Sequence, residues 1–136
     1  NMPKIIIASG PVIVEENKVL LNKHGDTPFY KFCGGKVEDY EHDLIWHAQR
    51  ELKEEMGLDM EIIDPNPFFL YTTKEKDSEK IDVILVHFLA KSIGQIKPGE
   101  DIREWAWVPL LELEALVKKD ELAPNIIPAL KHFGYL

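Results

Sequence analysis

Three glutamates lie within one short segment, Glu51, Glu54 and Glu55, and carboxylates at this spacing could bind a divalent cation. Apolar residues three or four apart predict a helix from about His42 to Met56. At about 100° per residue, with Glu51 at zero, Glu54 falls near −60° and Glu55 near +40°, an arc of roughly 100°. The three carboxylates are therefore expected to point in the same direction.

Carboxylates on one helix face repel each other, because each negative charge disfavours ionisation of the next. Mg²⁺ removes this cost, since it prefers oxygen ligands and is commonly held by one or two carboxylates together with substrate phosphates. Arg50 precedes Glu54 by four residues, the spacing at which a guanidinium pairs with a carboxylate and orients it. The charges alone would also fit an ordinary solvated helix face, so a metal site needs further support.

The elements around this helix are mostly predicted strands. They cover residues 4–14 and 19–21, which form a hairpin, and residues 29–33, 68–73, 81–90 and 103–108. Segments 74–80 and 94–100 are predicted loops, and 110–118 is a predicted helix. Gly57 is expected to end the glutamate helix, and Asn125 is expected to cap a last helix that ends at Gly134. Strands combined with helices predict an α/β protein.

Length and composition limit the classes of function. A chain of 136 residues fits one domain covering 1–136. Its net charge of −8 argues against binding of long nucleic acid but allows a small phosphorylated substrate. One cysteine excludes an internal disulfide and a zinc site built from several cysteines. No apolar run reaches the ~18 residues of a membrane span and no signal peptide is recognisable, so we expect a cytoplasmic protein without a membrane partner.

A longer motif contains the three glutamates and resembles the Nudix box, G-x5-E-x7-R-E-U-x-E-E-x-G-U with U aliphatic. The motif opens with Gly34-Gly35-Lys36-Val37-Glu38, and the run from Arg50 to Leu58 matches every specified position of the second half. The resemblance covers nearly the whole chain, with 107–113 as a weaker hallmark. It implies the Nudix fold, an α/β/α sandwich with a mixed β-sheet, with the box helix on one side and the C-terminal helix on the other.

The same resemblance implies a Nudix-type pyrophosphohydrolase that cleaves a diphosphate linkage, with Mg²⁺ or Mn²⁺ as its cofactor. By position, Glu54 and Glu55 would be metal ligands, and Gly34 would add its backbone carbonyl. Glu51 would be a further ligand or would help to deprotonate the attacking water. Arg50 would hold the acids in place, so Arg50, Glu51 and Glu54 form the expected catalytic group.

Some family members carry an additional acid on the loop before the last strand. Glu100 and Asp101 occupy a suitable place here and are candidates for a base or a metal ligand. The equal alternative is that both are ordinary loop acids.

The first half of the box departs from the family pattern. Gly35 to Glu41 fits G-x5-E, but eight residues instead of seven separate Glu41 from Arg50. Either Glu41 keeps the place of the first box glutamate or His42 occupies it.

Two residue types are also unusual. His47 lies near −40° on the predicted helix, where the family commonly has a small residue. A pair with Glu51 or packing on the sheet is the favoured interpretation of His47, and a metal or phosphate contact is the alternative. Cys33 stands where many members have proline, and packing is favoured over a reactive thiol.

The substrate stays open at this point. One reading is a nucleoside triphosphate, and the other is a nucleotide sugar or dinucleoside polyphosphate. A rival of another class is a catalytically silent Nudix-fold module that binds nucleotides or regulates a partner. Substrate-binding residues stay unassigned, and a homodimer is left open. Aromatic candidates for stacking on a base are Tyr30, Phe32, Phe69, Tyr71 and Trp105.

Overall fold

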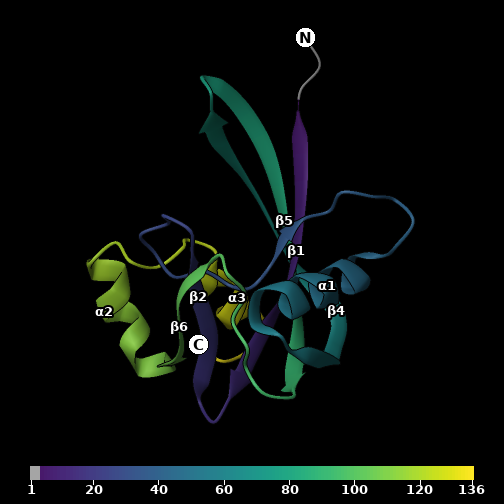
Figure 1. Ribbon diagram of the computed structural model, residues 1–136. Coiled ribbons are helices and arrows are strands. Elements are labelled where there is room, and N and C mark those ends of the chain that lie inside the picture. Colours follow the sequence, from purple (N-terminus) through teal and green to yellow (C-terminus); the bar gives the residue numbers. More distant parts are fainter. Residues whose placement is uncertain (1–3) are drawn as a thin grey trace.

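The computed structural model describes residues 4–136, so residues 1–3 of the predicted domain lie outside the described residues. Six strands and four helical segments make up the described chain (Figure 1). The strands are β1 (Ile5–Glu15), β2 (Lys18–His24), β3 (Gly35–Lys36), β4 (Asp59–Lys76), β5 (Glu79–Ile93) and β6 (Ile102–Pro109). The helical segments are α1 (Leu44–Met56), the 3-10 turn η1 (Leu110–Glu112), α2 (Leu113–Lys118) and α3 (Ile126–His132).

The strands form one mixed sheet in the order β4-β5-β1-β2-β6, with β3 paired to β1. β1 runs parallel to β5 and antiparallel to β2 and β3. The predicted hairpin between β1 and β2 is present, and its two turn residues, Glu16 and Asn17, both have positive φ. The predicted mixed sheet of a Nudix fold is therefore confirmed.

Helices pack on both faces of the sheet because neighbouring strand residues point in opposite directions. Val12 packs in a core cluster with Ile126 and Leu130 of α3. Ile13, the next residue, packs in another cluster with Leu52 and Met56 of α1. The structure confirms the predicted sandwich, in which the box helix and the C-terminal helix lie on opposite faces of the sheet.

Capping residues define the ends of α1. The side chain of Asp43 accepts a hydrogen bond from the backbone N–H of Trp46 at 2.8 Å, so the helix begins at Leu44, two residues later than predicted. Gly57 adopts φ 70° and its N–H bonds to the carbonyl of Lys53 at 3.0 Å. No helix within residues 4–136 combines the length and the apolar character that crossing a membrane would require.

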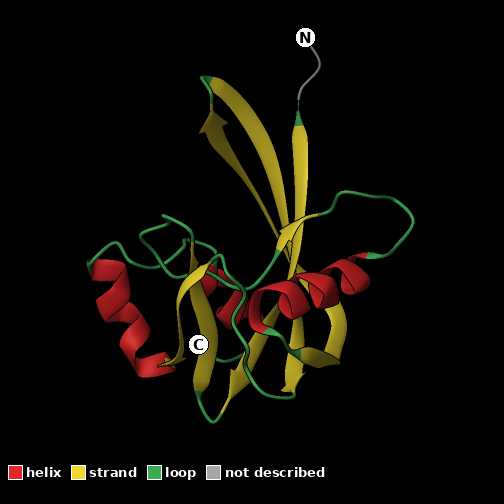
Figure 2. Ribbon diagram, viewed as in Figure 1, coloured by secondary structure: helices red, strands yellow, loops and turns green. Residues whose placement is uncertain are grey.

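The predicted loop at 74–80 was wrong, because β4 and β5 continue as a hairpin whose two turn residues are Asp77 and Ser78. Figure 2 shows this hairpin projecting beyond the helices beside the start of β1. The charged side chains at 74–80 are exposed to solvent, while the backbone forms hydrogen bonds across the hairpin. We call residues 69–84 the projecting arm.

Two further predictions were wrong. Residues 29–33 form no ladder strand; they make only isolated bridges, from Tyr30 to Leu122 and from Lys31 to Asn22. Asn125 does not cap α3 with its side chain, because its amide lies 2.9 Å from Nε2 of buried His87 instead. The last helix ends at His132, and the predicted helix at 110–118 is divided into η1 and α2.

Candidate active site

The three box glutamates lie on α1 at different depths. The Glu55 residue is buried, the Glu51 side chain is 13% exposed, and the Glu54 side chain is 58% exposed. Leu52 and Met56 anchor the same helix in the core with no exposed surface. The acids are therefore carried by a packed element, which suits a site that must hold its geometry.

Arg50 holds two of these glutamates. Its Nη1 contacts Oε1 of Glu51 at 3.0 Å and both carboxylate oxygens of Glu54 at 3.1 and 3.2 Å. Its Nη2 donates to the backbone carbonyl of Lys36 at 3.2 Å. The predicted i,i+4 pair with Glu54 is present, and the guanidinium also ties α1 to β3.

The paired glycines form the wall opposite the helix. The N–H of Gly34, whose φ is 154°, donates to Oε1 of Glu55 at 2.9 Å. A Cβ on Gly35 would collide with the carboxylate of Glu51. Residues without side chains thus let the loop backbone lie directly against both carboxylates.

The loop before β6 is attached to the end of α1. The N–H groups of Lys97 and Gly99 donate to the carbonyls of Met56 and Glu55 at 2.8 and 2.9 Å. These carbonyls lie in the last turn and have no partner within the helix. Using them to bind the loop brings Glu100 and Asp101 to the glutamates.

A cavity of about 110 Å³ lies between α1 and this loop. All three box glutamates, Glu100 and Asp101 line it, so the structure brings together the five acids that were candidates for a metal ligand or a base. Their roles in catalysis stay predictions. His24 also lines the cavity; it pairs with Ile102 across β2 and β6, a juxtaposition that no sequence spacing indicated.

Burial and the repulsion of neighbouring carboxylates make Glu51 and Glu55 difficult to ionise. Burial raises the pKa of Glu55 to about 7, against the opposing effects of the Gly34 hydrogen bond and the charge of Lys31. Burial also raises the pKa of Glu51, although neighbouring Arg50 lowers it. A cation placed among these carboxylates would stabilise their charged forms.

The donor set fits a hard divalent cation, because it consists of carboxylate oxygens facing a backbone loop. Within residues 4–136, however, no group of three or more His, Cys, Asp or Glu side chains is already gathered closely enough to hold an ion. The contacts explain this spacing: Glu55 turns to Gly34, while Glu51 and Glu54 turn to Arg50. Mg²⁺ usually keeps several waters, so a complete protein cage is not required.

Asp39 anchors the loop that contains the additional residue of the box. Its Oδ1 accepts the backbone N–H groups of Glu41 and His42 at 3.0 and 3.2 Å. The same oxygen lies 3.4 Å from Nε2 of His47. Within residues 4–136, no polar contact joins the side chain of Glu41 or His42 to Arg50; Asp39 instead connects this loop to the box helix.

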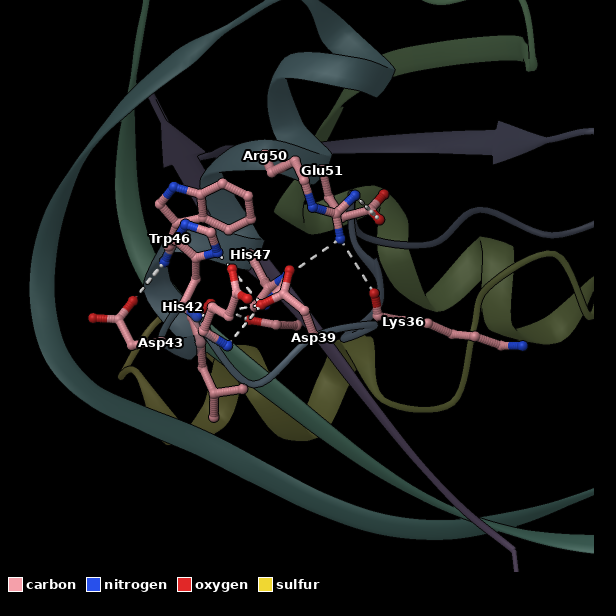
Figure 3. A network of polar contacts seen from close by, with 11 residues as sticks. Lys36, Asp39, His42, Asp43, Trp46, His47, Arg50 and Glu51 are labelled. Carbon is pink, nitrogen blue, oxygen red and sulfur yellow. Dashed lines mark hydrogen bonds and ion pairs between the residues drawn. The ribbon is translucent and has the colours of Figure 1, made fainter.

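His47 lies between Asp39 and Arg50, as Figure 3 shows. It is 1% exposed, and its Nδ1 lies 3.4 Å from Nη2 of Arg50. Because arginine only donates, Nδ1 is the acceptor in this contact, and Nε2 lies 3.4 Å from Asp39 without a hydrogen bond of its own among the described residues. The expected pair with Glu51 is absent: His47 packs inside and contacts Asp39 and Arg50.

The remaining candidates lie away from the cavity. Cys33 is buried, accepts a hydrogen bond from Nδ2 of Asn22 at 3.3 Å, and has a thiol pKa raised by burial, which fits the expected packing role. None of the five aromatic candidates lines the acidic cavity. Tyr30 and Phe32 are buried, whereas Phe69, Tyr71 and Trp105 are exposed.

Comparisons with known proteins agree with the fold. The family model described as the NUDIX domain matches residues 5–133. The MutT protein from Methanosarcina mazei superposes with a TM-score of 0.72 at 22% identity, over 98% of this chain and 95% of that one. The ORF135 protein of E. coli gives a TM-score of 0.69 at 24% identity, over 96% and 89% of the two chains.

A third structure, an Ap4A hydrolase from C. elegans in a binary complex, gives a TM-score of 0.68 at 21% identity and covers 94% of each chain. Among curated proteins, isopentenyl-diphosphate Delta-isomerase 1 of Mesocricetus auratus is 32% identical over 128 residues, covering 76% of this chain. The chain spans only about half of that relative, 55% of its length.

Proposed function

Because this chain belongs to the NUDIX domain family, we propose that it is a metal-dependent hydrolase that cleaves a diphosphate linkage in a nucleoside diphosphate derivative. The observation that carries the proposal is the cavity in which three box glutamates meet Glu100 and Asp101. The expected compartment is the cytoplasm, and a homodimer stays open.

Glu51, Glu54 and Glu55 would hold Mg²⁺ or Mn²⁺, together with the backbone carbonyl of Gly34. Such a cation, when bound, neutralises phosphate oxygens and lowers the pKa of a coordinated water. Their contacts with Arg50 and Gly34 fix where the carboxylates stand before any ligand arrives.

The proton of the attacking water needs an acceptor, and the cavity offers three candidates. Glu51 is held by Arg50 and lies against Gly35, so its position is the most restricted. Glu100 and Asp101 approach from the opposite wall. A general base must come within hydrogen-bond distance of the proton it removes, and all three line the same small space.

The test is hydrolysis of a broad panel with Mg²⁺ or Mn²⁺ and identification of every product. The panel includes nucleoside triphosphates, nucleotide sugars, ADP-ribose and diadenosine tetraphosphate. It also includes isopentenyl diphosphate, because the curated relative is an isomerase of that compound. Binding without turnover of any compound would favour the rival, a catalytically silent Nudix module.

Glu54→Gln is the most informative variant, because the Glu54 side chain is exposed enough for the helix to stay folded after the change. We expect turnover to fall by about two orders of magnitude or more, the scale of losing a charge stabiliser at the reacting centre. Glu112→Gln, an exposed acid on η1, is the matched control and should keep full activity. Full activity of the Glu54 variant would refute the proposed role.

A further inference from the structure

The projecting arm carries exposed apolar side chains on the face of the sheet that α1 covers elsewhere. Phe69 and Tyr71 of β4 pair with Val86 and Ile84 of β5, so all four side chains lie on this face. Val86 is buried in a core cluster with α1, whereas Phe69 and Tyr71 are 60% and 65% exposed. The arm extends beyond the helices (Figure 2), so its aromatic side chains face solvent.

The same part of β4 is an open edge of the sheet. Among the described strands, β4 is the outermost on its side and pairs only with β5. The N–H and C=O groups on the outer side of an edge strand can bind another strand. Pro65 and Pro67 lie where the register with β5 shifts, and a proline offers no N–H. From Phe68 to Lys76 the register is regular and proline is absent, so the unprotected edge coincides with the exposed aromatics.

The sequence of this edge is self-complementary about Tyr71. When two identical strands pair antiparallel, residues equally distant from the twofold axis lie opposite each other. With the axis at Tyr71, Phe69 lies opposite Thr73 of the second copy, and no charges of the same sign face each other. An axis at Lys74 or Glu75 would place that residue opposite itself, and opposed like charges destabilise a sheet.

The charge of the arm also permits self-association. The whole chain has a net charge of −8, so most of its surface repels a second copy. Residues 69–84 contain three lysines against four acids, which gives the arm a net charge of only −1. The arm therefore combines exposed aromatics, an open edge and little net charge.

We infer that the edge of the projecting arm, residues 68–76 of β4, binds a second copy of this chain in antiparallel pairing, with Tyr71 at the twofold axis. The two sheets then continue into each other across the interface. Because residues 69, 71 and 73 point to the same face, the exposed aromatics of both copies meet there. The proposed hydrolase does not require a second copy, so this association goes beyond it.

Cysteine cross-linking tests the register of the pairing. Tyr71→Cys places two thiols opposite each other at a separation that a disulfide can span, whereas Phe69→Cys and Thr73→Cys each face a different residue. The native Cys33 is buried and leaves the background low. Under mild oxidation, we expect the position 71 variant to form the covalent dimer at least tenfold faster than the other two. Equal rates at the three positions would overturn the pairing.

Sedimentation equilibrium over a range of protein concentrations tests the association itself. The wild type should dimerise, and Tyr71→Lys should raise the dissociation constant at least tenfold, because it sets two positive charges opposite each other. Val117→Lys is the matched control, since it replaces an exposed apolar residue of α2, 52% exposed, by the same charge. It should dimerise like the wild type. Circular dichroism checks that both variants fold.

Three outcomes would overturn the inference. A wild type that is monomeric at every soluble concentration would leave the arm to another occupant, such as a strand of a different protein. An unchanged dimer in Tyr71→Lys would place the interface elsewhere, and so would a dimer lost only in Val117→Lys. None of these measurements uses a substrate, so a failure of the proposed hydrolase would leave their result unchanged.

Discussion

Removing the charge of Glu55 should change how the stability of the metal-free protein depends on pH. Burial raises the pKa of this carboxyl from 4.5 to about 7. The folded state therefore holds its proton more tightly than the unfolded chain does. Its stabilising contribution is complete below about pH 4.5 and is lost as the pH rises through about 7.

The size of this effect follows from the rise of the Glu55 pKa from 4.5 to about 7. Each unit corresponds to about 1.4 kcal/mol, so ionising Glu55 costs the metal-free fold about 3 kcal/mol. Glu55→Gln cannot ionise but keeps an oxygen that can accept the Gly34 N–H. Between pH 4.5 and 8, the wild type should lose about 3 kcal/mol of unfolding free energy relative to this variant.

The assay is urea unfolding followed by circular dichroism, in the presence of a chelator and at several pH values. Mg²⁺ is then added at pH 8, where the ionised carboxylate should bind it. At 100 times its dissociation constant, Mg²⁺ should restore about 2.7 kcal/mol to the wild type and much less to the variant. Parallel pH profiles for the two proteins without metal would refute the reasoning.

Two further predictions concern the buried histidines His87 and His47. Burial lowers the pKa of His87 to about 4, so its neutral ring stabilises the fold above pH 6.5 and this contribution is lost as the pH falls through about 4. As the pH falls from 6.5 to 4, the unfolding free energy of the wild type should therefore decrease by about 3 kcal/mol more than that of His87→Gln. Urea unfolding at several pH values measures this difference, and equal decreases would contradict the prediction. His47→Leu removes both contacts of the buried ring and should lower kcat about tenfold and raise the Mg²⁺ requirement, whereas His47→Gln, which keeps a donor and an acceptor, should recover most of the activity. Steady-state kinetics at varied Mg²⁺ check this, and wild-type behaviour of the leucine variant would exclude a positioning role.

Periodicity was sufficient to predict the elements with a buried face. The helix of Glu51 and the hairpin of β1 and β2 were found because apolar residues recur at helical or strand spacing. Within the projecting arm, residues 74–80 were predicted to be a loop because nearly all of them are charged, so they have no apolar alternation to detect. These residues are extended because β4 pairs with β5 through the backbone, and β5 in turn pairs with β1. Such pairing is not visible in the side-chain pattern.

The site was predictable to the extent that its residues share one helix or one motif. The grouping of Glu51, Glu54 and Glu55 follows from helix geometry, and the approach of Glu100 from the family resemblance. Asp39, which contacts His47, and Lys31, whose charge acts on Glu55, were missed because these contacts depend on where loops return to the helix. His24 was missed for the same reason, since only the pairing of β2 with β6 brings it to the cavity.

The additional residue in the box leaves the grouping of the box glutamates intact because it falls outside α1. The helix begins only at Leu44, so the candidate residues Arg50, Glu51, Glu54 and Glu55 keep their helical spacing. The longer loop is held by Asp39, whose carboxylate binds two backbone N–H groups and contacts buried His47. Through His47 this loop reaches Arg50, and Arg50 in turn holds Glu51 and Glu54. The unusual histidine and the unusual loop are thus two parts of one connection, and a small residue at position 47 would leave Asp39 without a contact to the helix.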